Sequence, residues 1–143
     1  MRQTSARIHK FLARILFGGA NIAFFLIGLT VFGVTSTEVH AWGGRTLQGI
    51  ALLLVIAALL SRTSRLTVIL SVAVFLQLMP LQAILAYTHF PTRILNALHA
   101  ANGIAILWVS YALAFGRVRA SMPAEEPRAV AASVAPASSP RKA

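Results

Sequence analysis

Cysteine is absent from the 143 residues, which excludes disulfides, thiolate metal sites and cysteine nucleophiles. Acidic residues are scarce as well: the chain has three, and none lies in the core of a long apolar run. Exporters driven by protons or cations depend on an intramembrane carboxylate, so this class of transporter lacks its key group. No His-x-x-x-His pair and no nucleophile–base pair falls on one predicted helix, which argues against a zinc peptidase or a hydrolase.

Long apolar runs dominate what is present. The chain is 57% hydrophobic and 11% charged, whereas a soluble domain carries roughly 25% charged residues. A spanning helix needs about 20 apolar residues, and continuous runs without alternation favour helices over barrel strands. Residues 1–116 are therefore predicted to form an all-α four-helix transmembrane bundle, with N- and C-termini on the same side. The predicted helices cover residues 11–34, 36–60, 66–87 and 93–115.

Both ends of the chain have a predictable character. The first apolar run is longer than a typical signal-peptide core of about 7–15 residues, and no clear small-residue cleavage site follows it, so a retained anchor is expected. Residues 117–143 are rich in Ala, Pro and Ser and contain few bulky apolar side chains. That composition is typical of a disordered tail.

Three features predict local structure at the helix ends and within the third run. Thr35 followed by Glu38 fits a capping box at the start of the second helix. Thr92, after a proline, is expected to cap the fourth helix. Pro80 lies inside the third run and leaves the Leu76 carbonyl without its helical partner, so a kink is expected there.

The distribution of basic residues predicts the orientation of the bundle. Eleven of the thirteen basic residues lie in the N-terminal arm, the 61–65 turn or the C-terminal tail, and only Arg45 and Arg93 lie on the other side. The positive-inside rule then places both termini in the cytoplasm of a multi-pass protein, with the bacterial inner membrane as the expected location. The net charge of +10 is interpreted as a topology signal and an attraction to anionic lipid, so no nucleic-acid partner is expected.

Two of the four histidines open the same five-residue frame, HAWGG at His40 and HAANG at His99. Each lies a few residues past the predicted start of its helix, and both helices run inward, so their depths differ by only about 3 Å. Each histidine heads a helical stripe of glycine, aliphatic and small residues: Gly44, Leu47 and Ala51 below His40, and Gly103, Ile106 and Ser110 below His99. A glycine one turn below an imidazole leaves room for a flat ligand or another helix backbone.

Amide side chains are expected in the same outer layer, where Gln48, Gln82 and Asn102 lie. Polar groups in a bilayer are costly and usually face the bundle interior. Less specific interpretations stay open: His40 in the headgroup region, the glycines serving close helix packing, and Gln82 bonding the carbonyl freed by Pro80. The remaining histidines, His9 in the N-terminal arm and His89 in the outer loop, are expected to be solvated.

The stretch 32–119 resembles an uncharacterised family of small bacterial four-helix integral membrane proteins. The residues that carry the resemblance are His40-Ala-Trp-Gly-Gly44, Gln82 and Leu98-His99-Ala-Ala-Asn102-Gly103. The arrangement also resembles, in architecture only, the transmembrane b-type cytochromes, in which histidines on different helices hold haem. That second resemblance implies at most one haem here, because no intramembrane histidine is expected in the inner half.

The resulting hypothesis is one b-type haem, or a related flat redox ligand, between the second and fourth helices, serving electron transfer. His40 and His99 are the predicted iron ligands, and Gly44, Gly103, Gln82 and Asn102 the other cofactor-binding residues. The alternative is a non-catalytic subunit that docks against membrane partners or copies of itself, or a transport accessory protein. Under each hypothesis, the chain is not expected to be an enzyme on its own.

Overall fold

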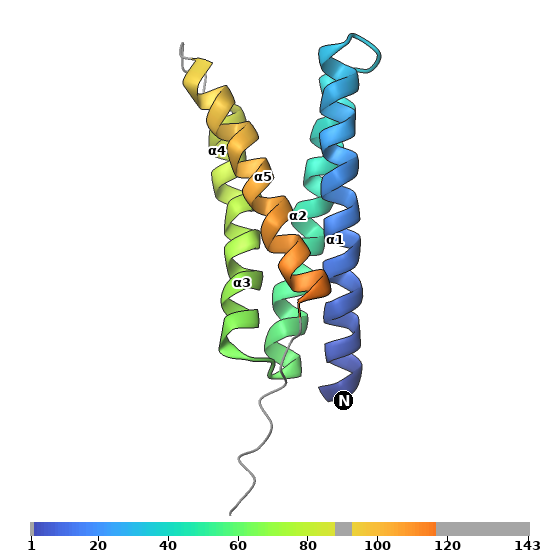
Figure 1. Ribbon diagram of the computed structural model, residues 1–143, viewed down its shortest axis with the longest axis vertical. Helices are drawn as coiled ribbons and strands as arrows, with labels where there is room; N and C mark the ends of the chain where they lie inside the picture. The colour runs from blue at the N-terminus through green and yellow to red at the C-terminus, as the bar shows by residue number, and fades with distance from the viewer. Residues whose placement is uncertain (1, 88–92, 117–143) are drawn as a thin grey trace, which may run out of the picture.

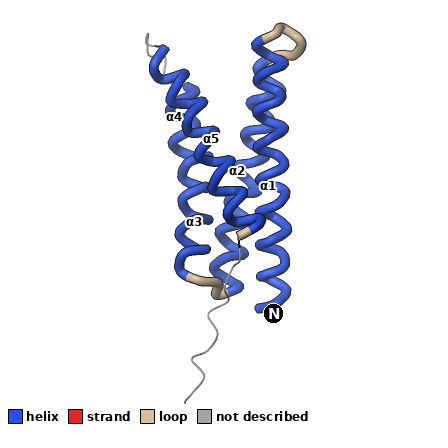
Figure 2. The backbone as a smooth tube through the Cα atoms, viewed as in Figure 1, coloured by secondary structure: helices blue, strands red, loops and turns tan. Residues whose placement is uncertain are grey.

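The computed structural model describes residues 2–87 and 93–116, and every regular element within them is helical (Figures 1 and 2). The π-helical turn η1 joins α3 to α4 without a break, so the elements form four rods. Each rod is long and apolar enough to cross a membrane, as expected of a multi-pass membrane protein. The elements are α1 (Arg2–Val31), α2 (Thr37–Ser61), α3 (Arg65–Leu76), η1 (Gln77–Leu81), α4 (Gln82–Tyr87) and α5 (Arg93–Phe115).

The predicted all-α four-helix architecture is therefore confirmed. The predicted tail at 117–143, the cap at Thr92 and the solvated His89 lie outside the described residues. The predicted start of the first helix near residue 11 is wrong, because α1 begins at Arg2. Residues 2–10 contain neither proline nor glycine, so nothing in that segment breaks the helix.

The turn between α1 and α2 is a Schellman motif. Val34 donates its backbone N–H to the Leu29 carbonyl at 2.8 Å, and Gly33 adopts a positive φ of 72°. The chain is then extended at Ser36, and α2 begins at Thr37 without a side-chain cap hydrogen bond. The predicted capping box at Thr35 is therefore wrong: the turn ends one residue later, which places Ser36 at the cap position.

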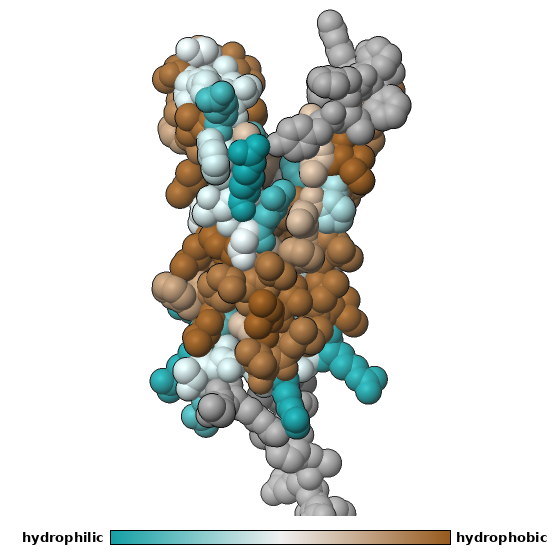
Figure 3. Space-filling view, turned by 180° about the vertical axis from the view of Figure 1, so that it is seen from behind, coloured by the Kyte–Doolittle hydropathy of each residue, from teal (hydrophilic) through white to brown (hydrophobic). Residues whose placement is uncertain are grey.

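The four rods pack in cyclic order, with α1 between α2 and α5, and α3 also between α2 and α5. No Cα atoms of α2 and α5 lie within 8 Å of each other, and the same holds for α1 and α3, so these pairs are diagonal. Apolar side chains cover the middle of the face shown in Figure 3, as expected of a lipid-facing surface. The buried apolar core comprises Ala13, Leu16, Leu47, Ala51, Leu54, Val74, Leu78, Ile106, Leu113 and Ala114.

The irregularity expected at Pro80 takes the form of the π-helical turn η1. The backbone N–H of Gln82 donates to the Gln77 carbonyl, one residue further back than in an α-helix. Two amides from the neighbouring helices also bond this turn: Gln48 Nε2 donates to the Leu78 carbonyl at 3.0 Å, and Asn102 Nδ2 to the Gln77 carbonyl at 3.1 Å. The turn is thereby tied to both α2 and α5.

Beyond η1, α4 packs against α5 but not against α2. The two hairpins therefore diverge at the end of the bundle that carries the α1–α2 turn (Figure 1). At the other end, which we call the basic end, lie the N-terminus and the turn at Arg62–Ser64. The π-helical turn thus separates a closed half of the bundle from an open half.

His9 lies at the basic end and is buried, with 1% of its surface exposed. Its Nε2 lies 3.0 Å from Ser71 Oγ, and the Ser71 hydroxyl donates to the Thr67 carbonyl at 2.8 Å. Because the hydroxyl proton is used there, His9 Nε2–H is the donor to Ser71. The expectation of a solvated His9 is wrong, since the early start of α1 carries this residue into the bundle.

Candidate functional site

A cleft of about 960 Å³ lies in the open half, between the α1–α2 hairpin and the α4–α5 hairpin. Its volume is near the upper end of the range of roughly 300–1,000 Å³ that ligand pockets occupy. Hydrophilic side chains gather in the hollow between the two arms (Figure 3). Five of the six predicted site residues line it: His40, Gly44, Gln82, His99 and Gly103.

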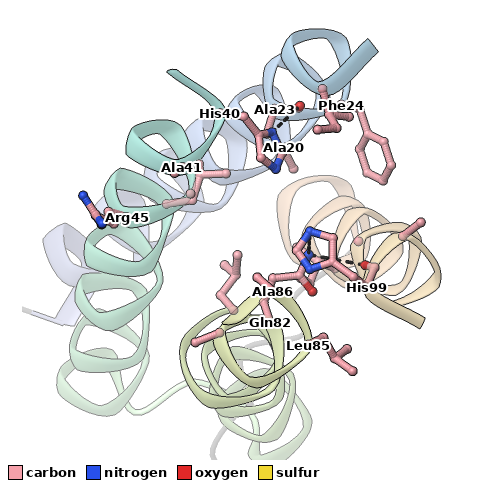
Figure 4. A pocket seen from close by; sticks show the side chains of 18 of the residues that line it. Ala20, Ala23, Phe24, His40, Ala41, Arg45, Gln82, Leu85, Ala86 and His99 are labelled. Carbon is pink, nitrogen blue, oxygen red and sulfur yellow. Dashed lines mark hydrogen bonds between the residues drawn. The ribbon is translucent and has the colours of Figure 1, made fainter. Parts of the chain in front are cut away.

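The two predicted histidines meet inside this cleft (Figure 4). The ring centroids of His40 and His99 lie 6.4 Å apart, with an angle of 63° between the ring planes. The prediction that they lie at one depth on diagonal helices is confirmed. The stripes below them also face inward as predicted, since four of their members are buried: Leu47, Ala51, Ile106 and Ser110.

The His40 ring is oriented by the backbone of α1. Its Nδ1 lies 3.0 Å from the Ala23 carbonyl oxygen, which can only accept, so Nδ1 carries the proton. A neutral His40 therefore has a lone pair on Nε2, and no hydrogen bond to that nitrogen is found within the described residues. An imidazole held through Nδ1–H by a backbone carbonyl, with Nε2 free, has the arrangement of a metal-ligating histidine.

The His99 ring is held by an amide relay from two helices. Asn102 Nδ2 donates to Gln82 Oε1 at 2.6 Å, which fixes the orientation of the Gln82 amide. Gln82 Nε2 then lies 3.1 Å from His99 Nε2 and 3.3 Å from the His99 carbonyl oxygen. The Gln82 side chain therefore does not serve the carbonyl freed by Pro80. Asn102, the sixth predicted residue, acts through Gln82 and is itself buried.

This relay leaves one nitrogen of His99 without a partner. Because Gln82 donates to Nε2, the proton of the neutral ring is on Nδ1. Nδ1 is buried and has no hydrogen-bond partner in the described structure. A buried unsatisfied donor costs about 1–3 kcal/mol. The site thus has an unused lone pair on His40 and an unused N–H on His99.

The two predicted glycines differ in their surroundings. A Cβ added at Gly44 would meet no atom within 4 Å, so its face of the cleft is open. A Cβ added at Gly103 would lie 2.9 Å from Phe24 Cζ, so the Phe24 ring occupies the space beside this glycine. Sequence reasoning missed Phe24, because nothing distinguishes one aromatic residue in an apolar run from its lipid-facing neighbours.

Arg45 and Glu38 also line the cleft, and sequence reasoning treated them only as topology and capping residues. The guanidinium carbon of Arg45 lies 4.8 Å from the centroid of the Trp42 ring, a cation–π contact. The available signal was the position of Arg45 in the sequence, since a basic residue inside a spanning segment is rare.

The donor set limits the chemistry of the cleft. Within the described residues, no group of three His, Cys, Asp or Glu side chains could hold a metal ion. A metal bound by the protein alone normally takes three or four such ligands. Two opposed imidazoles suffice for an iron whose other four ligands come from a tetrapyrrole.

No protein-family model, curated protein or solved structure matches this chain. The candidate site therefore rests on its own geometry.

Proposed function

We propose that the cleft binds one b-type haem, that His40 and His99 would hold its iron, and that the protein serves electron transfer in the membrane. The observation that carries this proposal is the 6.4 Å separation of the two ring centroids. Metal–nitrogen bonds of about 2.0–2.1 Å, with rings built from bonds of about 1.33 Å, require centroids about 6.2–6.5 Å apart across one iron. The centroid separation of the two rings lies within this range, and His40 Nε2 is free of a hydrogen bond within the described residues.

The donor atoms at each histidine support the same proposal to different degrees. His40 fits as it stands, because Ala23 holds Nδ1 and Nε2 is free. His99 fits once Gln82 releases Nε2, a loss of about 0.5–1.5 kcal/mol. Gln82 keeps its bonds to the His99 carbonyl and to Asn102, so the helix remains anchored. The bound haem would supply one-electron redox chemistry.

The location proposed is the bacterial inner membrane, with the basic end in the cytoplasm. Support comes from the described basic residues of α1 and the α2–α3 turn, which lie toward one end of the bundle. The cleft opens toward the other end, so the haem would lie in the outer half of the bilayer. Electron partners would then approach from the outer side.

A quinone is the second candidate, favoured by the unpartnered Nδ1–H of His99. A quinone carbonyl oxygen accepts a hydrogen bond, so it would satisfy that donor without disturbing Gln82, once the atoms that cover Nδ1 move aside. The reduced form has a hydroxyl, which would donate to the free Nε2 of His40. This ligand needs no metal and would leave the protein without a haem absorption band.

Absorption spectroscopy tests the haem proposal. Protein purified in detergent from haem-sufficient cells should show a Soret band, and His40→Ala and His99→Ala should each abolish or shift it. His9→Ala is the matched control, because it removes another buried histidine at the far end of the bundle. Its spectrum should be unchanged. A folded wild-type protein that remains colourless after haemin is added would exclude the haem proposal.

A further inference from the structure

Arg45 is an exposed, charged side chain at the edge of the cleft, within a helix long and apolar enough to cross a membrane. Glu38 is the only acidic residue in the described ranges, and no ion pair between it and Arg45 is found. A charge at this depth is costly and is usually retained for a function. The only described contact of the guanidinium is the Trp42 ring, which leaves its hydrogen-bond donors free.

The position of Arg45 follows from the π-helical turn. Because α2 contacts α3 and η1 but not α4, the cleft has a lateral opening between α2 and α4. Arg45 lies at the outer edge of the cleft on α2, turned away from the two imidazoles, while Gln82 and Ala86 lie on α4 (Figure 4). A helical side chain leans toward the N-terminus of its helix, so the guanidinium reaches back to Trp42, nearer the membrane surface.

We propose that Arg45 is the anion-recognition residue of this lateral opening and binds a propionate carboxylate of the haem. The inference rests on the proposed function, since it names the protein group that meets the charged edge of that ligand. A tetrapyrrole held between His40 and His99 has an apolar body for the cleft and carboxylates on one edge. Arginine binds a carboxylate through two parallel N–H bonds, which gives both orientation and affinity.

Charge in the cleft is compatible with this role. Glu38 lies seven residues before Arg45, which places it on the same face and about 10 Å closer to the start of the helix. Its carboxylate is stabilised there by the positive end of the α2 dipole. Arg45 is the only arginine or lysine among the residues that line the cleft, and no anionic group pairs with it in the described structure.

Haemin and its dimethyl ester provide the test, because they share the iron and the ring but only haemin carries carboxylates. Apo-protein in phosphatidylcholine nanodiscs is titrated with each, and the Soret band is measured. Wild type should bind haemin at least about tenfold more tightly than the ester, as expected for a charge-assisted hydrogen bond. Arg45→Gln should remove that preference while keeping the Soret band, and Arg45→Lys should retain part of it.

Arg14→Gln is the matched control, since it removes one exposed basic residue in the other half of the bundle. It should keep the wild-type preference. Equal binding of haemin and ester by wild type would overturn the role of Arg45 and leave the haem site intact. Binding of neither would overturn the proposed function, and with it the propionate contact.

A phospholipid headgroup offers the same anionic chemistry, so a separate arm uses protein purified from membranes without added haemin. Retention of phosphatidylglycerol by wild type but not by Arg45→Gln, together with no preference for haemin over the ester, would assign the anion to lipid and overturn the proposal. Equal retention of phosphatidylglycerol by both proteins, with the haemin preference present, supports the propionate contact.

Discussion

The imidazoles of His40 and His99 meet across a diagonal of the bundle, with centroids 6.4 Å apart, although no Cα atoms of their helices lie within 8 Å. The other diagonal, between α1 and α3, is bridged at the basic end by His9 and Ser71. The two pairs differ in whether their polar atoms have hydrogen-bond partners. His9 and Ser71 form a buried hydrogen bond, whereas the outer pair lines a cleft and keeps an unused lone pair on His40 and a buried, unused N–H on His99.

Replacing Gln82 with leucine should alter the environment of His99. The change removes the hydrogen bonds to His99 and leaves Asn102 with one partner fewer, so we expect a loss of about 1–3 kcal/mol in unfolding free energy. The Soret maximum and the reduction potential should also shift, because leucine removes a polar amide that lies beside the His99 ring and bonds the His99 carbonyl. Thermal unfolding followed by circular dichroism, and a redox titration, measure these effects.

Gln48→Leu is the control for that experiment. Gln48 donates one bond to the Leu78 carbonyl and none to a histidine among the described contacts. Because Gln48 lines the cleft but contacts neither histidine, its replacement should destabilise the bundle and move the reduction potential less than Gln82→Leu does. A potential that changes equally in both variants would contradict a specific role for Gln82.

Glycine-to-alanine substitutions should distinguish an effect on ligand binding in the cleft from an effect on helix stability. Gly44 and Gly49 both have open surroundings, but only Gly44 lines the cleft. Alanine should favour the helix at both positions by up to about 1 kcal/mol. Only Gly44→Ala should weaken haemin binding, as measured by titration of the apo-protein. Equal affinities in the two variants would show that the ligand does not approach Gly44.

Gly103→Ala has a different expected result. The added Cβ would lie 2.9 Å from Phe24 Cζ, so the Phe24 ring, which lines the cleft, must shift. The nearest atom, Phe24 Cζ, is at the far end of a flexible side chain, so the protein should still fold. Haemin binding should be weaker than in Gly44→Ala, because the displaced ring lines the cleft. Phe24→Leu in the same background should restore part of the binding, and no restoration would rule out this clash as the cause.

The His9–Ser71 contact should stabilise the basic end. His9→Ala and Ser71→Ala each remove one partner of a buried hydrogen bond, and His9→Ala also opens a cavity, so it should cost more, about 2–4 kcal/mol. Thermal unfolding of the single and double variants gives the coupling energy. A double variant whose loss equals the sum of the single losses would show that the two side chains do not interact.

The bundle was predictable because hydrophobic length and continuity decide it, and the paired histidine frames gave the correct depth and diagonal for His40 and His99. The capping residue was not predictable, since Thr35 and Ser36 have nearly equal propensities and the Gly33 turn decides between them. Burial of His9 was missed because basic neighbours suggested a solvated arm, whereas an uninterrupted helix carries it inward.

The sequence predicted which residues line the site better than it predicted the contacts that hold them. Ala23 holds His40 through a backbone carbonyl, which any residue would supply, so no sequence signal marks it. The lateral opening depends on where α4 separates from α2, which Pro80 suggests only as an irregularity of unknown form. Arg45 was visible as an unusual charge, but its place at the opening required the packing of three helices.

Reporter fusions test the proposed orientation, on which the outer position of the cleft depends. Ser64 lies in the turn at the basic end, and Thr35 lies in the turn at the opposite end. A reporter active only outside the cytoplasm should therefore be active after Thr35 and inactive after Ser64, because basic flanks are retained in the cytoplasm. Replacing Arg62 and Arg65 with glutamine should raise the minority of inverted molecules, since two topology signals are removed. Activity after Ser64 in the unmodified chain would reverse the orientation, and the cleft with His40 and His99 would then open toward the cytoplasm.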